Sequence, residues 1–253
     1  MIKRIYNLVK DTILPFEMRW ETINECLPLD KLPPEASLQV WLPAIFNQLQ
    51  EGSCSANSGC TCMEILAKKF WHEDVRLSRA FLYQAERILN NTLYQDDGAR
   101  LRNTQQVLMD TGVCLAKDDP YTPQDFVVEF TPALLQEAEQ YRIHTGFWAP
   151  TLLEILNALN DGFPVQVGIF VYPSFESESV AQTGTVPMPS AEDLAHGPLG
   201  GHAVTAYGYD IPNQLVLLAN SWGDQWGNAG KFTLPFAYFE SDQTFMSSRV
   251  YEL

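Results

Sequence analysis

The sequence predicts an α+β fold in which a helical half is followed by an antiparallel sheet half. Between Cys54 and about residue 161, apolar residues recur mostly at steps of three or four, the spacing of helices with one buried face. After Pro164 the period changes to two, because valine and isoleucine alternate with other residues over residues 165–172. The chain has 253 residues, 46% of them hydrophobic, which is enough for one large domain or two compact lobes.

Residues 1–40 are predicted to form an extended arm, since prolines recur among mixed polar and apolar residues along this stretch. We expect a single domain over residues 41–253. Its helical lobe should cover about residues 41–161 and its β lobe about residues 162–253.

The helical half contains start and stop signals for several helices. Ser78 can cap one helix, and Gly112 is placed to end another. Pro132 and Pro150 stand at plausible first turns of two more. The helix that follows Cys54 has a stripe of small or apolar residues, namely Ala56, Cys60, Met63, Ala67 and Phe70.

The sheet half contains four predicted strands and one long loop. Residues 173–201 are rich in proline, glycine, serine and acids and show no period, so we expect a loop, and loops of this length are often functional. Residues 210–213 are predicted to form a hairpin turn. The strands are expected at residues 165–172, 202–209, 215–221 and 231–234.

Composition excludes several classes of partner. A formal net charge of −15 argues against nucleic acid, and the sequence has no basic patch interleaved with aromatic residues. No apolar run reaches membrane-spanning length, and the first twenty residues lack a signal-peptide pattern. We therefore expect no nucleic-acid or membrane partner and a cytoplasmic, reducing location, with export by another route left open.

Five cysteines, an odd number, cannot all be paired in disulfides. Cys54, Cys60 and Cys62 could suggest a metal cluster. However, C-x-C spacing on a helix turns two side chains about 200° apart. No second pair or nearby histidine completes a tetrahedral site. We predict no metal and no other cofactor.

Cys54 is the main candidate for chemistry because it stands at a predicted helix start. Free backbone N–H groups and the positive end of the helix dipole favour an anion there, which biases a thiol toward the nucleophilic thiolate. Gly52 and Ser53 allow the preceding loop to approach a ligand. The alternative is that Cys54 is inert, since a lone cysteine on an apolar helix is usually a small core residue.

Two downstream motifs supply partners for this thiol. His202 opens a predicted strand 148 residues after Cys54 (202 − 54), and Asn220 ends the next strand, 166 residues after it (220 − 54). The hairpin between them can make the side chains neighbours, so that Asn220 orients the imidazole and His202 acts as base. The chain order Cys54, His202, Asn220 resembles that of the papain-like cysteine peptidases, in particular the bacterial branch of the family. The resemblance runs from Leu32 to Tyr238.

The resemblance implies a two-lobe fold, with a helical lobe followed by an antiparallel β-sheet or barrel lobe and the active cleft between them. It implies a thiolate–imidazolium pair of Cys54 and His202 that reacts through an acyl-enzyme. Gln48, six residues before Cys54, falls where the family places a side chain that binds the oxyanion. Trp222 would cover the His–Asn hydrogen bond, although packing of a tryptophan beside a strand explains it equally well. The residues implied to contact substrate are Gly52, Ser53, Gly98, Ala99, Ala203 and Trp222.

Several positions depart from the family pattern. Glu51 stands where the papain signature has a cysteine, and Ser55 stands where an aromatic residue follows the nucleophile. Leu49 and Ala99 each replace a glycine that the family usually has. The change at Glu51 removes a disulfide partner, but no departure removes a catalytic group.

The sequence therefore predicts a thiol endopeptidase that acts on peptide or protein substrates. Three alternatives remain: a Cys–His acyltransferase or amidase, an exopeptidase, and a degenerate protein that binds peptides without cleaving them. The exopeptidase would require residues 173–201 or the arm to block one end of the cleft. The biological substrate and the oligomeric state are not predicted.

Two further features remain open at this level. Asp96 and Asp97 either favour basic substrate side chains or form a solvated acidic loop. The arm carries Phe16, Met18 and Trp20, which could lie in or near the cleft and make the enzyme latent.

Overall fold

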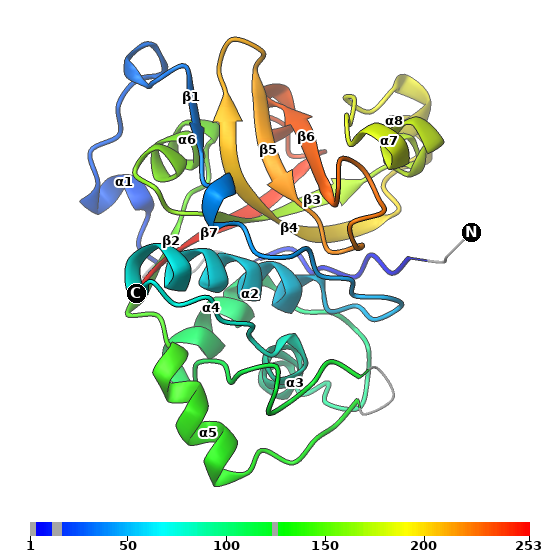
Figure 1. Cartoon of the computed structure of the whole chain (residues 1–253). Coiled ribbons are helices and arrows are strands. Elements are labelled where there is room, and N and C mark those ends of the chain that lie inside the picture. Colours follow the sequence, from blue (N-terminus) through cyan, green and yellow to red (C-terminus); the bar gives the residue numbers. More distant parts are fainter. Residues whose placement is uncertain (1–3, 12–16, 123–125) are drawn as a thin grey trace.

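The computed structural model describes residues 4–11, 17–122 and 126–253, and it divides into a sheet half and a helical half (Figure 1). This confirms the predicted α+β class. The helices are α1 (Trp20–Ile23), α2 (Cys54–Leu66), α3 (Arg79–Asn90), α4 (Leu101–Asp110), α5 (Pro132–Ala138), α6 (Leu152–Asn160), α7 (Glu178–Thr183) and α8 (Ala191–His196). The strands are β1 (Glu35–Ser37), β2 (Thr145–Trp148), β3 (Val165–Val171), β4 (Gly200–Asp210), β5 (Leu215–Ala219), β6 (Lys231–Pro235) and β7 (Phe245–Glu252).

Helix α2 lies between the two halves, and every one of its residues is buried. It contacts α3 and α4 on one side and β4 on the other. The predicted apolar stripe fails at Phe70, which is 45% exposed, because the helix ends at Leu66 and the chain continues in a wider π-helical turn, Ala67–Trp71. The position of α2 places its first residue, Cys54, where both halves meet.

The capping signals of the helical half are borne out at most positions. Ser78 accepts a hydrogen bond from Phe81 N–H at the start of α3, and Gly112 follows α4 with φ of +83°. Pro132 begins α5. Pro150, in contrast, precedes the N-cap Thr151 of α6, because Thr151 supplies the capping oxygen for Glu154 N–H.

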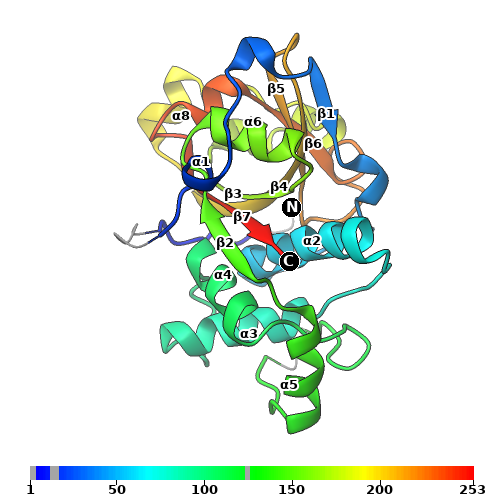
Figure 2. The same ribbon diagram turned by 90° about the vertical axis from the view of Figure 1, so that its left-hand side faces the viewer.

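The sheet is antiparallel, with strand order β2-β7-β3-β4-β5-β6 and β1 added to β4. It does not close into a barrel within the described residues. Figure 2 shows β2 and β7 side by side, reaching down toward the helical half, where both contact α4. Neither strand was predicted, since each is defined by pairing with segments far away in the sequence. The sheet thus includes strands from before residue 162.

Strand β3 shows the predicted alternation of residue types but is buried on both faces, since α2 and α6 both contact it. Its polar residue Gln166 is fully buried and donates to Ser55 O at 2.7 Å and to Ser58 Oγ at 2.8 Å. Tyr251 OH donates to the Gln166 side-chain oxygen. The sheet is therefore hydrogen-bonded to the first turn of the helix that carries Cys54.

Residues 173–201 were predicted to be a loop without secondary structure, but they contain α7 and α8. Each helix has only six residues, too few for a hydrophobic period to be visible. Local caps stabilise them instead, through Ser177 for α7 and Ser190 for α8.

The segment before residue 41 contains α1 and β1, and it packs into the core. Trp20 is 2% exposed and lies edge-on to Phe147 and Phe163. Arg249, also buried, forms an ion pair of 2.9 Å with Asp11. Among the described residues, no helix is both long and apolar enough to span a membrane.

Candidate active site

Cys54 is the first residue of α2, and Ser53 occupies the N-cap position before it. Only 1% of the Cys54 surface is exposed. Burial raises the pKa of the Cys54 thiol to about 12, although backbone N–H groups, including that of Ala203, act in the opposite direction. Desolvation thus outweighs the hydrogen bonds from these backbone N–H groups, so burial disfavours the thiolate in this arrangement.

His202 lies on β4, and Asn220 directly follows the neighbouring antiparallel strand β5. His202 Nε2 lies 2.8 Å from Asn220 Oδ1. The same oxygen accepts Ser221 N–H at 2.8 Å, which identifies it as an acceptor and assigns the imidazole proton to Nε2. The other nitrogen, Nδ1, is buried and has no hydrogen-bond partner in the described part of the chain. It is therefore the basic nitrogen of the ring.

Trp222 stacks on the imidazole of His202, with ring centroids 4.9 Å apart and an interplanar angle of 22°. It also contacts Phe175 and Trp226 edge-on, as a core tryptophan does. Trp222 therefore lies over the imidazole and also packs in the core, so the two explanations considered for it are compatible. Burial lowers the pKa of His202 to about 4. The Asn220 hydrogen bond opposes this shift, and the charge of Arg4 adds to it.

These shifts have opposite signs for the two groups. A thiol with its pKa raised to about 12 and an imidazole with its pKa lowered to about 4 are both neutral at physiological pH. The thiolate–imidazolium pair that the resemblance implies is therefore not favoured in this arrangement, because burial disfavours each charged form.

Gln48 is 2% exposed and connects the loop before α2 to the residue after Asn220. Its backbone N–H donates to Ser221 O at 2.8 Å, and its side-chain oxygen accepts from Ser221 Oγ at 2.6 Å. Its side-chain nitrogen donates to Glu51 O at 2.8 Å. A primary amide nitrogen carries two hydrogens, so one remains available to a substrate oxygen.

Residues 4–11, which we call the N-terminal segment, run between the two halves (Figure 1). Leu8 N–H donates to Gly201 O of the sheet half, and Val9 N–H donates to Ala99 O of the helical half, both at 3.0 Å. Leu8 is 5% exposed. It packs in an apolar cluster that contains Cys54, Leu101, Ala203 and Met246, with Phe170 at its edge. The segment therefore helps to bury the cluster that contains Cys54.

The outer part of the same segment covers the histidine. The Tyr6 ring meets the His202 ring edge-on at 6.0 Å between centroids. The Arg4 guanidinium lies 4.1 Å from the centre of the Trp222 ring and forms an ion pair with Glu176. His202 and Cys54 are thus shielded from water by one continuous stretch of chain.

Two glycines make room for this stretch. A Cβ on Gly52 would lie 2.2 Å from Asn7 Nδ2, and a Cβ on Gly98 would lie 2.0 Å from Asn7 O. Gly98 also has φ of +73°, which favours glycine. Of the six predicted substrate contacts, Gly52, Gly98, Ala99, Ala203 and Trp222 border the N-terminal segment. Ser53 differs, because its hydroxyl is buried against Tyr121 and Asn57.

The family model described as papain family cysteine protease matches residues 36–241. The chain belongs to the papain family of cysteine proteases. It is 31% identical over 212 residues to an uncharacterized peptidase C1-like protein of Acanthamoeba polyphaga mimivirus, a match that covers 79% of this chain and 67% of the relative. It is 26% identical over 195 residues to a viral cathepsin of Cydia pomonella granulosis virus, a match that covers 74% of this chain and 52% of that relative.

Solved structures agree with this assignment. Xylellain, a cysteine protease from Xylella fastidiosa, superposes with a TM-score of 0.86 at 25% identity, covering 98% of this chain and 95% of that one. This supports the resemblance to the bacterial branch. A cysteine protease of Carica candamarcensis in complex with E-64 gives a TM-score of 0.66 at 20% identity, and the match covers 87% of this chain and 99% of that one. The papain-like fold is thus confirmed.

This papain-family chain holds the loop before Cys54 without a disulfide. All five cysteines are free thiols, and Glu51, at the position of the family cysteine, is 8% exposed. Gly52 N–H donates instead to both carboxylate oxygens of Asp96, at 2.9 and 3.0 Å. Tyr83 OH donates to the same carboxylate at 2.5 Å. The Asp96 carboxylate is therefore used in hydrogen bonds that hold the loop before Cys54. It is neither free to bind a basic substrate side chain nor simply solvated. Asp97 is exposed.

The sequence did not identify which arm residues lie at the site. Of the three arm residues named above, Trp20 belongs to the core of the sheet half, Met18 is 44% exposed, and Phe16 lies outside the described residues. The residues at the site are Tyr6 and Leu8. The only sequence signal for the burial of the site by these two residues is the apolar character of their side chains.

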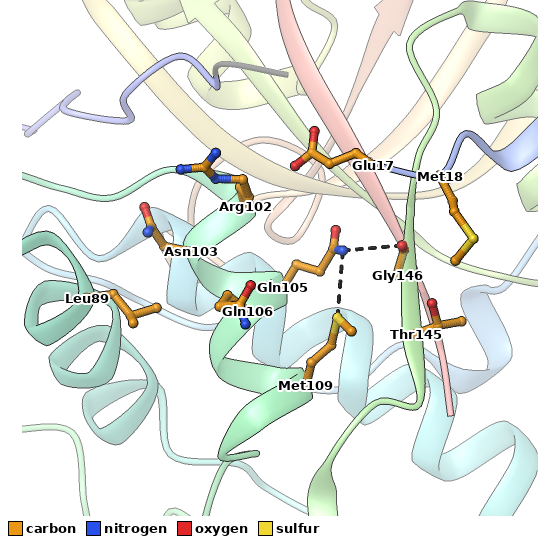
Figure 3. A pocket seen from close by; sticks show the side chains of 10 residues that line it. All are labelled: Glu17, Met18, Leu89, Arg102, Asn103, Gln105, Gln106, Met109, Thr145 and Gly146. Carbon is orange, nitrogen blue, oxygen red and sulfur yellow. Dashed lines mark hydrogen bonds between the residues drawn. The ribbon is translucent and has the colours of Figure 1, made fainter. Parts of the chain in front are cut away.

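Figure 3 shows a separate cavity of about 430 Å³. Helix α4 forms one wall, and Glu17 and Gly146 belong to the other. Gln105 Nε2 donates to Gly146 O at 3.2 Å across it. None of Cys54, His202, Asn220 and Gln48 lines this cavity, so it plays no part in the proposed chemistry. Within the described residues, no group of three or more His, Cys, Asp or Glu side chains is placed to hold a metal ion.

Proposed function

We propose that this protein is a cysteine endopeptidase that its own N-terminal segment holds in a latent state. The observation that carries the proposal is the His202–Asn220 hydrogen bond in the sheet half, together with the burial of Cys54 in one apolar cluster with Leu8. Family membership supports cysteine protease chemistry. Latency follows from the covering of both reacting groups.

The proposed reaction begins when the N-terminal segment leaves the site. Water then reaches both groups, so the thiol proton can move to His202 Nδ1 and form the ion pair. The thiolate attacks the substrate carbonyl carbon, and the carbonyl electron pair becomes an oxyanion. Cys54 N–H and the second Gln48 side-chain N–H stabilise this charge.

The remaining steps use His202 first as acid and then as base. Its imidazolium gives a proton to the leaving amine as the carbon–nitrogen bond breaks, which leaves an acyl-enzyme on Cys54. Neutral His202 then removes a proton from water, and the hydroxide equivalent releases the acyl group as a carboxylic acid. Asn220 accepts Nε2–H throughout, which fixes the imidazole and leaves Nδ1 as the nitrogen that exchanges the proton.

The path of the N-terminal segment supports an endopeptidase rather than an exopeptidase. The chain continues on both sides of Leu8, from Arg4 beside Trp222 to Val9 beside Ala99. The site therefore has room for peptide chain on both sides of the Leu8 position. An endopeptidase needs such room, because its substrate continues on both sides of the cleaved bond. Because Leu8 fills an apolar cluster, we expect preferred substrates to place a leucine-like side chain there.

The test uses an internally quenched peptide with a leucine near its centre. The full chain with Leu8→Ala should cleave it at an internal bond, and adding Cys54→Ala should abolish cleavage. His202→Ala should abolish turnover and slow alkylation of Cys54 near pH 6, because no imidazolium then stabilises the thiolate. Hydrolysis that persists without Cys54 would refute the proposal. So would removal of terminal residues only.

A further inference from the structure

The two proposed oxyanion donors, the Gln48 side chain and Cys54 N–H, stand at opposite ends of one turn, residues 48–54. Both must point at the same substrate oxygen from about 2.7–3.1 Å. A misplacement of about 1 Å can reduce a reaction rate by about 10²-fold. The separation of the two ends of the turn therefore determines how well the charge is stabilised.

The hydroxyl of Tyr121 bridges the two ends. It donates to Gln48 O at 2.8 Å, and Ser53 Oγ, next to Cys54, lies 2.8 Å from the same hydroxyl and can donate to it. Burial raises the pKa of Tyr121, so its hydroxyl stays protonated and keeps donating. Tyr121 belongs to a different segment, which follows the buried residue Asp119, so it braces the turn from outside.

Tyr121 is itself held in place by α3. The Arg79 guanidinium lies 3.9 Å from the centre of the Tyr121 ring, and Arg79 Nη1 donates to Asn57 Oδ1 at 2.9 Å. Asn57 Nδ2 completes the arrangement by donating to Ser53 O at 2.8 Å and Ser53 Oγ at 3.0 Å. Both Asn57 and Ser53 are fully buried. The brace is therefore packed on more than one side rather than formed by a single exposed hydrogen bond.

We propose that Tyr121 is a positioning residue for the oxyanion hole, which rests on the proposed peptidase function. Its hydroxyl sets the distance between Gln48 and the start of α2. Loss of the hydroxyl leaves both donors present but less well aligned, so the effect should be smaller than loss of a donor. Removing a donor costs about 10²–10³ in rate. We expect Tyr121→Phe to lower kcat about 10-fold, because it misplaces donors without deleting one.

The experiment is a double-mutant cycle in the full chain with Leu8→Ala. It compares Tyr121→Phe, Gln48→Ala and the double variant. The matched control is Tyr172→Phe, which also removes a hydroxyl that donates to a backbone carbonyl, Gln243 O at 2.7 Å. Tyr121→Phe should lower kcat with unchanged KM and an unchanged rate of Cys54 alkylation. Its effect should nearly vanish in the Gln48→Ala background, since it acts through Gln48.

Three outcomes would overturn the inference. The first is a kcat for Tyr121→Phe equal to that of Tyr172→Phe. The second is an undiminished effect without Gln48, and the third is slower alkylation, which would place the defect at the thiol. Absence of hydrolysis in the Leu8→Ala parent would instead refute the proposed peptidase function, and this inference with it.

Discussion

Replacing Leu8 with alanine should activate the enzyme without removing any catalytic group. Leu8 is the residue of the N-terminal segment that belongs to the apolar cluster around Cys54, and it is 5% exposed. Deleting residues 1–25 would be a poor alternative. It would remove the core residue Trp20 and leave the buried charge of Arg249 without Asp11. Breaking a buried ion pair costs about 3–5 kcal/mol, so the fold itself would be at risk.

The magnitude follows from the contacts that Leu8 makes. Burying a leucine side chain stabilises the covered state by about 1.5–3 kcal/mol. The Arg4–Glu176 ion pair is partly exposed, with 21% and 29% of the side chains accessible, and such pairs contribute about 0–1 kcal/mol. Leu8 is therefore the stronger contact. Loss of about 2 kcal/mol increases the open-to-covered ratio about 30-fold, since about 1.4 kcal/mol is a factor of ten.

The assay follows peptide hydrolysis and alkylation of Cys54 by iodoacetamide at pH 6. In the covered state the pKa of Cys54 is raised and that of His202 is lowered, so pH 6 lies between them and both groups are neutral. Opening hydrates both groups and permits the thiolate. Hydrolysis and alkylation should therefore rise together, by about 30-fold if most molecules begin covered.

Lys10→Ala is the matched control, since Lys10 belongs to the same segment but is exposed. It should leave both rates near those of the wild type. Circular dichroism should show that both variants are folded. If folded Leu8→Ala protein hydrolyses and alkylates at wild-type rates, the N-terminal segment does not inhibit the enzyme.

Two further predictions follow from the site. Asn220→Ala should keep measurable turnover in the Leu8→Ala chain, because Asn220 orients His202 but takes no proton; a loss as complete as that of His202→Ala would contradict this role. Thiol titration of freshly purified, active protein in denaturant without reductant should find five free cysteines, and a protected disulfide would contradict this.

Cys54, His202 and Asn220 could be proposed from the sequence because local signals coincide with the residue order of the papain-like family, whereas Gln48 was placed by that resemblance alone. Cys54 precedes an apolar stripe at helical spacing, and His202 and Asn220 stand at the ends of runs with strand character. Ser78 and Gly112 mark helix ends through their own chemistry, which does not depend on distant residues.

Other features were missed because they depend on contacts between distant parts of the chain. Strand β7 is defined by its pairing with β2 and β3. The burial of Gln166 depends on a partner more than a hundred positions earlier, Ser55. The apolar character of Leu8 does not show which cluster it joins, and nothing in the residue type of Tyr121 indicates that its hydroxyl bonds to the turn of residues 48–54. The pKa shifts of Cys54 and His202 likewise result from burial, which the motif alone does not determine.

The central claim is that Cys54 is the nucleophile, at a site that peptides occupy. A peptidyl epoxide is a suitable probe, because its peptide part tests the binding site and its epoxide reacts with a nucleophilic thiolate. Treating the Leu8→Ala chain should attach one label per molecule to Cys54, located by peptide mapping, and hydrolysis should fall in proportion to labelling. Hydrolysis that continues after Cys54 is fully labelled, or labelling that falls on Cys26 instead, would contradict the account.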